Sequence, residues 1–314
     1  ELERLGQVVE VISPDGRPWI PCPTYPEIPL SLFSGRYVAR RIEQSGADAV
    51  HIATEGPLGL AARRHCLERG IAFTTAYHTA FPEYVAARVG FGTDAVYRFM
   101  RWFHGASAGV MVATDSLHRQ LTERGFTRLR PWSRGVDAQL FKPRDKGFLK
   151  ARRPVNLYAG RVVVDKHIEV FLQLKLPGSP HVVGGGPQLA KLQRKYPEAQ
   201  FTGYVSDAEL AAYYAAADVF VFPSRTDTFG LVLLEALAAG VPVAAYPVTG
   251  PLEVIGDRGV GNLYQDLGRA IDRALQMQPD VCRAHALTYT WAASTQQFLS
   301  HLQPRSASLG DAAD

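Results

Sequence analysis

The sequence predicts an α/β protein with two domains, each built on a parallel β-sheet. Short apolar runs alternate with amphipathic helical patterns along almost the whole chain, and this alternation is typical of parallel βαβ units. The 314 residues suffice for two domains of roughly 100–200 residues each. Glycine, proline and charged residues gather at residues 142–154, which we interpret as the linker. In such sheets, ligands bind at the carboxyl ends of the strands.

Residues 1–144 are expected to form the first domain. They open with the pattern of an amphipathic helix, from Glu1 to Leu5, followed by Gly6, because glycine commonly ends helices. This helix starts in mid-pattern, so we expect that a strand and a glycine-rich loop are missing ahead of it. The elements expected after it are a strand at 8–12, a helix at 38–44, a strand at 49–53, a helix at 58–69, strands at 72–77 and 108–113, and a helix at 117–124.

Residues 145–302 are expected to form the second domain. Ser206 and Glu209 have the spacing of a capping box, which predicts the start of a helix. A helical pattern at about residues 268–302 predicts a C-terminal helical tail, and residues 303–314 are expected to be disordered. The other expected elements are strands at 155–159, 181–184, 200–202, 219–222 and 241–245, and helices at 168–173, 188–194, 207–216 and 229–239.

The composition excludes several classes of protein. With 46% hydrophobic and 20% charged residues, the chain is not a disordered protein. The sequence contains no apolar run as long as a membrane-spanning helix, and its first residues have neither a secretory nor a transit pattern, so a cytoplasmic protein is expected. Its three cysteines predict buried, reduced thiols rather than disulfides or a zinc site. A net charge of +4 is too small to indicate a nucleic-acid partner.

The first candidate site lies where an apolar strand is followed by a helix. The amides of Phe229, Gly230 and Leu231 are expected at the N-terminus of this helix, a position that attracts anions. Asp227 precedes the helix and Glu235 lies about two turns later, so these carboxylates could hold hydroxyl groups of a sugar and of a ribose. The alternative is that Asp227 only caps the helix and that Glu235 is a solvated helix residue.

The second candidate site is a pair of cations. Arg161 and Lys166 follow the expected strand at 155–159, five positions apart. At the carboxyl end of a strand they could converge on one diphosphate, the arginine in bidentate fashion and the lysine as a point charge. Two fixed cations could replace a divalent metal in stabilising a leaving diphosphate. The alternative is that both are ordinary surface cations.

Five segments of the second domain and four of the first carry a resemblance to a known family. They are Gly160–Lys166, Gly184–Pro187, Phe201–Tyr204, Ala217–Ser224 and Asp227–Glu235, with His51–Gly59, Thr75–Thr79, Phe81–Tyr84 and Ser133–Asp137 upstream. In this order they resemble retaining glycosyltransferases of family 4, and the upstream segments resemble bacterial GDP-mannose-dependent α-mannosyltransferases. The resemblance implies the GT-B fold, in which two facing Rossmann-like domains with parallel sheets hold the active site between them.

The resemblance implies roles for the charged residues of the second domain. Arg161 and Lys166 match the residues that bind the donor diphosphate. Asp227 matches the residue that binds the transferred sugar, and Glu235 matches the one that binds the nucleoside ribose. The family has glutamate where this chain has Asp227, one methylene shorter, so the identity of the sugar is less determined.

The resemblance also implies a place for the nucleobase. Tyr204 and Val205 match the segment that holds the base, largely through backbone groups. Since side chains encode this contact poorly, guanine and uracil remain equal alternatives here. The family's Gly-Asp-Gly-Pro motif is Gly184 to Pro187 in this chain, with Gly185 in place of the aspartate, which keeps the turn and removes a carboxylate.

His78 is the candidate catalytic residue of the first domain. It follows the expected strand at 72–77, and by itself such a histidine is interpreted as a structural residue. The resemblance implies instead that it contacts the donor sugar near the reacting carbon, and we assign it orientation and charge stabilisation. Glu55 and Glu83 are nearby acids that could bind acceptor hydroxyl groups, or could serve as helix-cap or surface carboxylates.

The segment from Tyr97 to His104 mixes aromatic and basic residues at helical spacing. Helices that lie on a membrane surface use this mixture, and a peripheral contact with the inner face of the membrane is therefore one interpretation. A buried domain helix whose arginines extend to solvent would look the same.

The sequence as a whole predicts a metal-independent retaining glycosyltransferase without a cofactor. It would transfer a hexose, mannose from GDP-mannose, to a hydroxyl group of a lipid or glycan acceptor. Arg161, Lys166 and the helix N-terminus at Gly230 would stabilise the departing diphosphate, with His78 and Asp227 as the further catalytic residues. The alternatives are a truncated, inactive nucleotide-sugar-binding protein, a UDP-sugar-dependent transferase, or epimerisation or phosphorolysis on the same fold.

Overall fold

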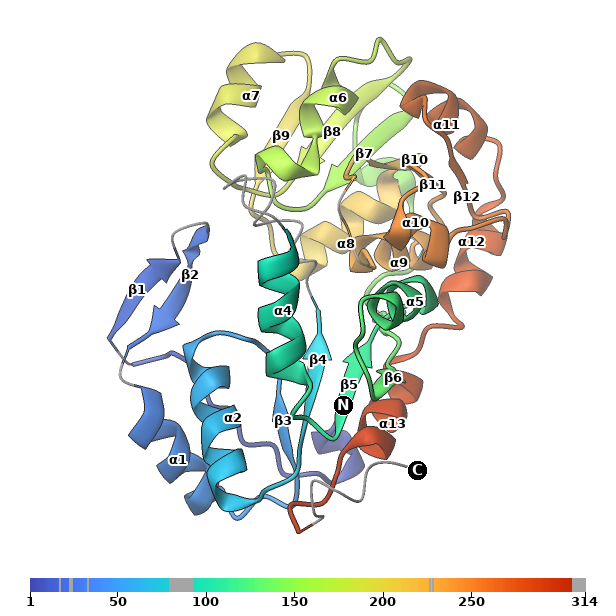
Figure 1. Cartoon of the computed structure of the whole chain (residues 1–314). Coiled ribbons are helices and arrows are strands. Elements are labelled where there is room, and N and C mark those ends of the chain that lie inside the picture. Colours follow the sequence, from blue (N-terminus) through green and yellow to red (C-terminus); the bar gives the residue numbers. More distant parts are fainter. Residues whose placement is uncertain are drawn as a thin grey trace. The chain divides into compact units, whose positions relative to one another are not determined.

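The structure is a computed structural model, and it describes residues 1–16, 18–22, 25–32, 34–78, 93–225, 227 and 229–306. It divides into two compact units. The first contains residues 1–133 and 295–314, and the second contains residues 134–294. Each unit has its own parallel sheet flanked by helices (Figure 1), which confirms the predicted α/β fold class.

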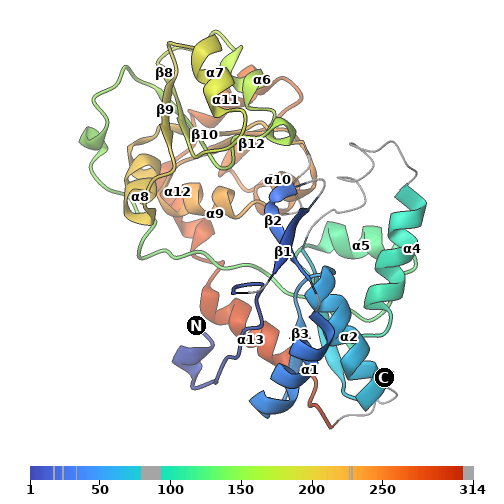
Figure 2. The same cartoon turned by 90° about the vertical axis from the view of Figure 1, so that its left-hand side faces the viewer.

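The first unit is built on a four-stranded parallel sheet of order β3-β4-β5-β6. Helices α1 and α2 pack side by side in both views (Figures 1 and 2). Its elements are η1 (Glu3–Leu5), β1 (Trp19–Cys22), β2 (Tyr25–Ser31), α1 (Ser34–Ser45), β3 (Val50–Ile52), α2 (Pro57–Arg69), β4 (Phe73–Tyr77), α4 (Thr93–His104), β5 (Gly109–Val112), α5 (Asp115–Glu123) and β6 (Leu129–Pro131).

Helix α4 completes the core of the first unit. Phe103 packs with residues of α1, α2 and β4, including Phe73. Tyr97 and Met100 pack instead with residues of β5 and α5. All three α4 side chains are at most 1% exposed, so this helix joins two apolar clusters of the unit.

The second unit is built on a six-stranded parallel sheet of order β12-β11-β10-β7-β8-β9. Helix α9 packs against α12, as both views show (Figures 1 and 2). Its elements are η2 (Lys146–Phe148), β7 (Val155–Ala159), η3 (Val164–Lys166), α6 (Ile168–Leu172), β8 (Ser179–Val183), α7 (Leu189–Lys195), β9 (Gln200–Gly203), α8 (Asp207–Ala216), β10 (Val219–Phe222), α9 (Leu231–Ala238), β11 (Val243–Ala245), α10 (Thr249–Val254), β12 (Gly261–Leu263), α11 (Leu267–Ala274), α12 (Pro279–Ala286) and α13 (Trp291–His301), whose last residues belong to the first unit.

The units divide at a different place from the boundary expected at residue 144. Arg283 of α12 donates hydrogen bonds to the backbone oxygens of Phe141 (2.8 Å) and Ala138 (3.0 Å), which ties this segment to the second unit. Conversely, Gln297 of α13 accepts hydrogen bonds from the amide and hydroxyl of Ser133 (2.8 and 3.0 Å) in the first unit.

Residues 303–306, which the sequence assigned to a disordered tail, pack on the first unit. Arg305 donates its amide to the backbone oxygen of Asp48 (2.6 Å), and its guanidinium pairs with Glu43 (2.6 Å). This prediction was therefore wrong for these four residues, because a single arginine supplies backbone and side-chain contacts together. Residues 307–314 lie outside the described part of the chain.

Two local predictions in the first domain were also wrong, the strand at 8–12 and the burial of Cys22. The apolar run at 8–12 is not a strand, since it pairs with no described strand, and Val8 is fully exposed. Strands β1 and β2 pair in antiparallel fashion, which the sequence did not predict because prolines argue against strands. In a two-stranded hairpin each strand has a free edge, where a missing proline N–H costs little. Cys22 is only half-buried, whereas Cys66 and Cys282 are buried as predicted.

The helix predictions of the second domain are confirmed. Ser206 and Glu209 form the predicted capping box at the start of α8. The short elements α10 and β12 were not predicted, because three to six residues carry too little periodicity. No helix of the described residues is both long enough and apolar enough to cross a bilayer.

The three consecutive glycines after β8 allow two loops to touch. A Cβ atom on Gly184, whose φ is +126°, would lie 2.0 Å from the backbone oxygen of Gly160. The three atoms nearest to a Cβ atom on Gly185 would all belong to the ring of Tyr204, the first at 2.4 Å. That ring is 81% exposed and can rotate away.

Gly184→Ala should therefore lower the free energy of unfolding by at least about 1–3 kcal/mol, because backbone strain and a backbone clash combine. Gly185→Ala is the matched control and should cost much less. Urea denaturation of both variants checks this expectation. Equal losses would mean that the two loops do not approach as closely as the structure shows.

Candidate functional site

The strand order of the second unit defines where a ligand is expected to bind. Numbered along the chain from β7, the order is that of the doubly wound nucleotide-binding sheet, and it reverses between β7 and β10. These two strands are parallel neighbours, with Val219 beside Asn156. Lys166 follows β7 and Asp227 follows β10, so the sheet brings both residues to the same edge at the reversal.

Lys166 and Asp227 form an ion pair at this edge. The Lys166 Nζ atom lies 2.7 Å from Asp227 Oδ2, and the side chains are 14% and 18% exposed. The other oxygen of Asp227, Oδ1, accepts a hydrogen bond from the amide of Phe229 (3.4 Å). The amide of Gly250 donates to the Asp227 backbone oxygen (3.1 Å). The pair is thus largely desolvated and held in place by backbone groups.

Asp227 does not cap α9, so the alternative that it is only a helix-capping residue is wrong. The N-cap residue of α9 is Gly230, in the left-handed conformation with φ +81°, and no side chain caps the helix. Phe229 is 5% exposed, whereas Leu231 at the first position of the helix is 42% exposed. The helix therefore begins at the sheet edge, with Asp227 engaged by Lys166 instead.

Arg161 lies on the same loop as Lys166, with an exposed side chain. Its backbone oxygen accepts a hydrogen bond from the hydroxyl of Tyr158 (2.8 Å). Burial raises the pKa of Tyr158, which stays a neutral donor. The next residue, Val162, donates its amide to the backbone oxygen of Gly185 (2.8 Å). The cation-bearing loop is thus anchored to the β7 strand and to the glycine loop.

Tyr204 and Val205 occupy the loop between β9 and α8. The ring of Tyr204 lies over Gly185 and is largely open to solvent. Because β7, β8 and β9 are consecutive in the sheet, the loops that follow them lie at one edge. The structure therefore places Tyr204, Val205, Arg161 and Lys166 at the same edge of one sheet.

Glu235 is partly buried, so the alternative that it is a solvated helix residue is wrong. It lies on α9, and its Oε2 atom accepts a hydrogen bond from the hydroxyl of Tyr214 on α8 (2.9 Å). Tyr214 is fully buried. Burial raises the pKa of Glu235, with a smaller opposing effect of the Tyr214 hydrogen bond and a further small rise from Asp207. Tyr214 is its hydrogen-bond partner among the described residues, and a partly buried carboxylate with so few partners is costly for stability.

In the first unit, His78 follows β4 and is half-buried. Its ring packs against Trp132, with centroids 5.5 Å apart, and Trp132 packs in turn against Phe298 of α13 (5.0 Å). His301 of the same helix contacts the backbone oxygen of Pro131 (2.8 Å). The C-terminal helix therefore supports the aromatic residue that holds the His78 ring.

Glu55 lies in the turn between β3 and α2, with its Oε1 atom 3.0 Å from Nε2 of His104. Since β3 and β4 are parallel neighbours, Glu55 and His78 lie at the same edge of the sheet. Glu83, the other acid suggested by the sequence, lies outside the described residues.

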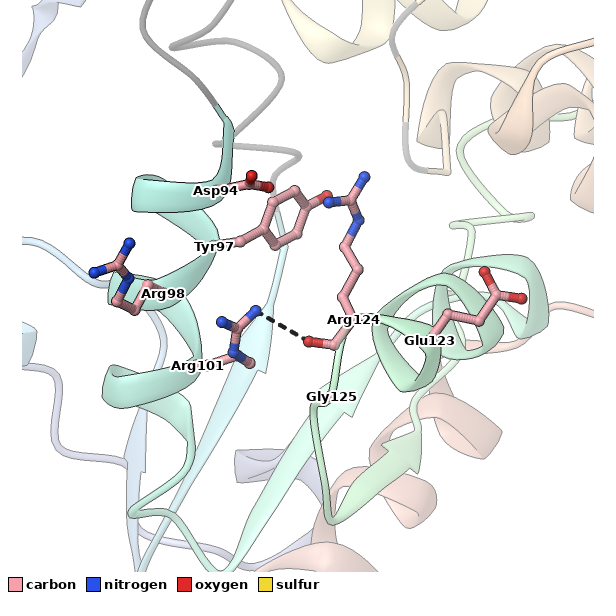
Figure 3. Close-up of a pocket in the computed structure, with 7 residues that line it drawn as sticks. All are labelled: Asp94, Tyr97, Arg98, Arg101, Glu123, Arg124 and Gly125. Carbon is pink, nitrogen blue, oxygen red and sulfur yellow. Dashed lines mark hydrogen bonds between the residues drawn. The ribbon is translucent and has the colours of Figure 1, made fainter.

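The pocket drawn in Figure 3 lies elsewhere, between α4 and α5. It has a volume of about 570 Å³ and is lined by three arginines with Tyr97, Asp94 and Glu123. Arg101 donates to the backbone oxygen of Arg124 (3.1 Å), and the Arg124 guanidinium lies 3.9 Å from the centroid of the Tyr97 ring. None of the predicted site residues lines this pocket, and the contacts of Arg101 and Arg124 join the two helices.

The sequence analysis missed three residues that support the site: Tyr214, Trp132 and His104. Each is a buried or half-buried aromatic or histidine next to a candidate residue. Tyr214 lies in an alanine-rich apolar helix, where it looks like a core residue. Only the tertiary structure directs its hydroxyl to Glu235, so no sequence signal could have found it.

The fold and the charged sheet edges define an α/β protein of the doubly wound, nucleotide-binding type. Comparison with known families makes this specific. The family described as Glycosyltransferase Family 4 matches residues 1–140, and Glycosyl transferases group 1 matches residues 153–277. Together these matches cover most of the chain, which belongs to the group 1 glycosyltransferases of family 4.

Named relatives differ in the sugar that their names specify. The chain is 29% identical over 289 residues to a GDP-mannose-dependent alpha-mannosyltransferase of Mycobacterium tuberculosis (83% of this chain, 76% of the relative). It is 30% identical to the sulfoquinovosyl transferase SQD2 of Arabidopsis thaliana over 75% of this chain, but it spans only 49% of that relative. The structure of Anabaena HepE in complex with UDP-glucose has a TM-score of 0.66 at 17% identity, over 83% of this chain and 80% of that one. These likenesses confirm the family and the fold.

Glu235→Gln should raise the melting temperature of the ligand-free protein at neutral pH. A carboxyl group whose pKa is raised in the folded state contributes stability below its unfolded pKa, and that contribution is lost as the pH rises through the folded pKa. Glutamine removes the buried charge and can still accept the Tyr214 hydrogen bond. The difference from the native protein should therefore shrink below about pH 4.

Thermal unfolding followed over this pH range is the measurement. Glu198→Gln, which changes an exposed carboxylate of the same unit, is the matched control and should not produce this pattern. Destabilisation by Glu235→Gln at neutral pH would show that the ionised form is favoured in the folded protein.

Proposed function

We propose that this protein is a retaining glycosyltransferase that transfers a hexose, mannose from GDP-mannose, to a hydroxyl group of a lipid or glycan acceptor. The observation that carries the proposal is the partly buried Lys166–Asp227 ion pair at the reversal of the strand order. A cation and a carboxylate held together there match a diphosphate linked to a sugar, because the phosphate attracts the lysine and the sugar hydroxyls donate to the carboxylate.

When the donor binds, Lys166 and Asp227 can exchange each other for groups of the donor. Lys166 contacts a diphosphate oxygen, which frees Asp227 to accept a hydrogen bond from a sugar hydroxyl. Arg161, exposed on the same loop, adds a bidentate phosphate contact. Glu235 binds the ribose hydroxyls, and Tyr204 and Val205 lie beside the base.

In the transfer step the bond between the anomeric carbon and the diphosphate oxygen breaks while the acceptor oxygen bonds to the same face of that carbon. Arg161, Lys166 and the start of α9 stabilise the charge that develops on the diphosphate. The departing diphosphate takes the acceptor proton, so the protein supplies no nucleophile. The ring of His78 packs against Trp132, which fixes its orientation. In this orientation it contacts the sugar and stabilises the positive charge that develops on the sugar ring.

The choice of GDP-mannose is supported by the mycobacterial relative, whose name specifies that donor. The Arabidopsis relative and the UDP-glucose complex of HepE indicate the alternatives, another hexose and a uridine donor. The aromatic residues of α4 give no support to a membrane contact, because Tyr97 and Phe103 are buried and Arg63 stacks on the exposed Trp102 at 3.9 Å.

The test is a donor comparison in buffer with EDTA. Isothermal titration with GDP-mannose and UDP-glucose, with GDP and UDP as references, measures binding, and release of the nucleoside diphosphate in the presence of alkyl glycoside acceptors measures turnover. We expect tighter binding of the guanosine ligands and turnover that persists in EDTA. Preference for the uridine ligands would overturn the donor, binding without turnover would overturn the activity, and rescue by Mg²⁺ of an EDTA-inactive enzyme would overturn the metal-free mechanism.

Lys166→Ala should weaken GDP-mannose binding by about 10- to 100-fold, because a charge-assisted phosphate contact contributes about 1.5–3 kcal/mol. Arg161→Lys should also weaken it, since the bidentate geometry is lost. Titration calorimetry measures both. Lys195→Ala, which removes an exposed cation at the end of α7, is the control and should leave binding unchanged. An unchanged affinity of Lys166→Ala would remove this lysine from the diphosphate site.

Asp227→Asn and Glu235→Gln should distinguish the residue that binds the transferred sugar from the residue that binds the ribose. Glu235→Gln should weaken binding of both GDP and GDP-mannose, by about 1–3 kcal/mol. Asp227→Asn should leave GDP binding unchanged or slightly tighter, because Lys166 loses its competing partner, while it lowers turnover of GDP-mannose. Calorimetry with both ligands is the measurement. Equal losses of GDP affinity in the two variants would show that the roles are divided wrongly.

A further inference from the structure

We propose that His104 is a positioning residue that orients Glu55 to bind a hydroxyl group of a polyol acceptor at the sheet edge of the first unit. This inference rests on the proposed function, since it specifies the acceptor side of the same reaction. It is carried by a hydrogen-bond chain that runs inward from Glu55 through His104 to Thr75 and Ser107.

The chain is almost completely buried except at Glu55. His104 is 1% exposed, Thr75 0% and Ser107 1%. The side chain of Glu55 is 22% exposed. Nδ1 of His104 lies 2.9 Å from Thr75 Oγ1, and Nε2 lies 3.0 Å from Glu55 Oε1. A buried imidazole with a partner on each nitrogen has a single orientation, so it fixes the position of the Glu55 oxygen that it contacts.

The hydrogen bonds of this chain engage both nitrogens of the His104 ring. The Ser107 hydroxyl donates to the backbone oxygen of His104 (2.7 Å). The Thr75 hydroxyl lies 3.2 Å from the Ser107 hydroxyl and 2.9 Å from Nδ1 of His104. A Thr75 hydroxyl that donates to the closer atom, Nδ1, leaves Nε2–H to donate to the Glu55 carboxylate.

Glu55 keeps one oxygen for a ligand. Within the described residues, Oε1 is engaged by His104 and no group donates to Oε2. Glu55 also does not cap the following helix, since the N-cap of α2 is Gly56 and no side chain caps it. A carboxylate that is held at one oxygen and partly exposed beside the turn into α2 is arranged to accept a hydrogen bond from a ligand hydroxyl group at its other oxygen.

The position of Glu55 fits the acceptor. Glu55 and His78 follow neighbouring parallel strands, paired at Ile52 and Thr75, so they lie at the same sheet edge. Thr75, on β4, belongs to the strand that leads to His78. One hydrogen-bond chain therefore links the turn after β3, the strand β4 and the end of α4, which leaves Glu55 little freedom to turn away.

The experiment measures binding of octyl α-D-mannopyranoside, a hydroxyl-rich probe, in the presence of GDP. Glu55→Gln and His104→Gln should each weaken binding by about tenfold or more, and the double variant should lose no more than the stronger single variant, because the two residues act as a unit. Glu68→Gln, an exposed carboxylate on α2, is the matched control and should bind normally. Absence of binding to the native protein, or normal binding by either variant, would overturn the proposal.

A second measurement separates positioning from a general effect on folding. In protein labelled with ¹⁵N-histidine, nitrogen NMR should show a shift of the His104 ring signals in Glu55→Gln, because the partner of Nε2 changes from a carboxylate to an amide. His104 signals that are the same in the native protein and in Glu55→Gln would overturn the contact. Binding of GDP tests the second unit separately. Failure to bind GDP would overturn the proposed function, whereas the mannoside measurement tests the role of His104 and Glu55.

Discussion

The parallel pairing of β7 with β10 is the constraint on which the candidate site depends. Because the strand order reverses there, the loops that follow these strands leave the sheet edge side by side, and the ion pair between Lys166 and Asp227 forms in the space between them. Neither residue would lie near the other in a different strand order, since 61 positions separate them along the chain. The pair is costly to desolvate, and the backbone amides of Phe229 and of Gly250 on α10 hold Asp227 in place.

The surrounding loops serve to keep this edge compact. Glycines after β8 let the backbone come within contact of the loop that carries Arg161 and Lys166. On the other side, Tyr214 reaches from α8 to Glu235 on α9 and holds a carboxylate whose pKa is raised by burial. Glycine adopts the positive φ at Gly184 without the strain that a Cβ atom would cause, whereas burial of the Glu235 carboxylate lowers stability through desolvation.

In the first unit, side chains of neighbouring elements hold the candidate residues His78 and Glu55 in place. Hydrogen bonds and ring contacts from neighbouring elements support each one: Trp132 and Phe298 hold His78, and His104 holds Glu55. The supporting residues are themselves buried or packed against α13, whose C-terminal part belongs to this unit although it comes last in the sequence. The end of the chain therefore contributes to the position of a residue near its beginning.

The sequence by itself determined the fold class, most of the regular elements and the charged residues of the second unit. Strands such as 155–159 and 219–222 were predicted to the residue, because continuous apolar runs flanked by glycine or proline are local signals. The resemblance to family 4 added the expected roles: Arg161 and Lys166 for the diphosphate, and Asp227 and Glu235 for the sugar and the ribose. The tertiary structure alone decided the rest: the Pro-rich hairpin, the packing of Arg305, and the partners Tyr214, Trp132 and His104. These depend on contacts between distant segments, and such contacts leave no periodic pattern along the chain.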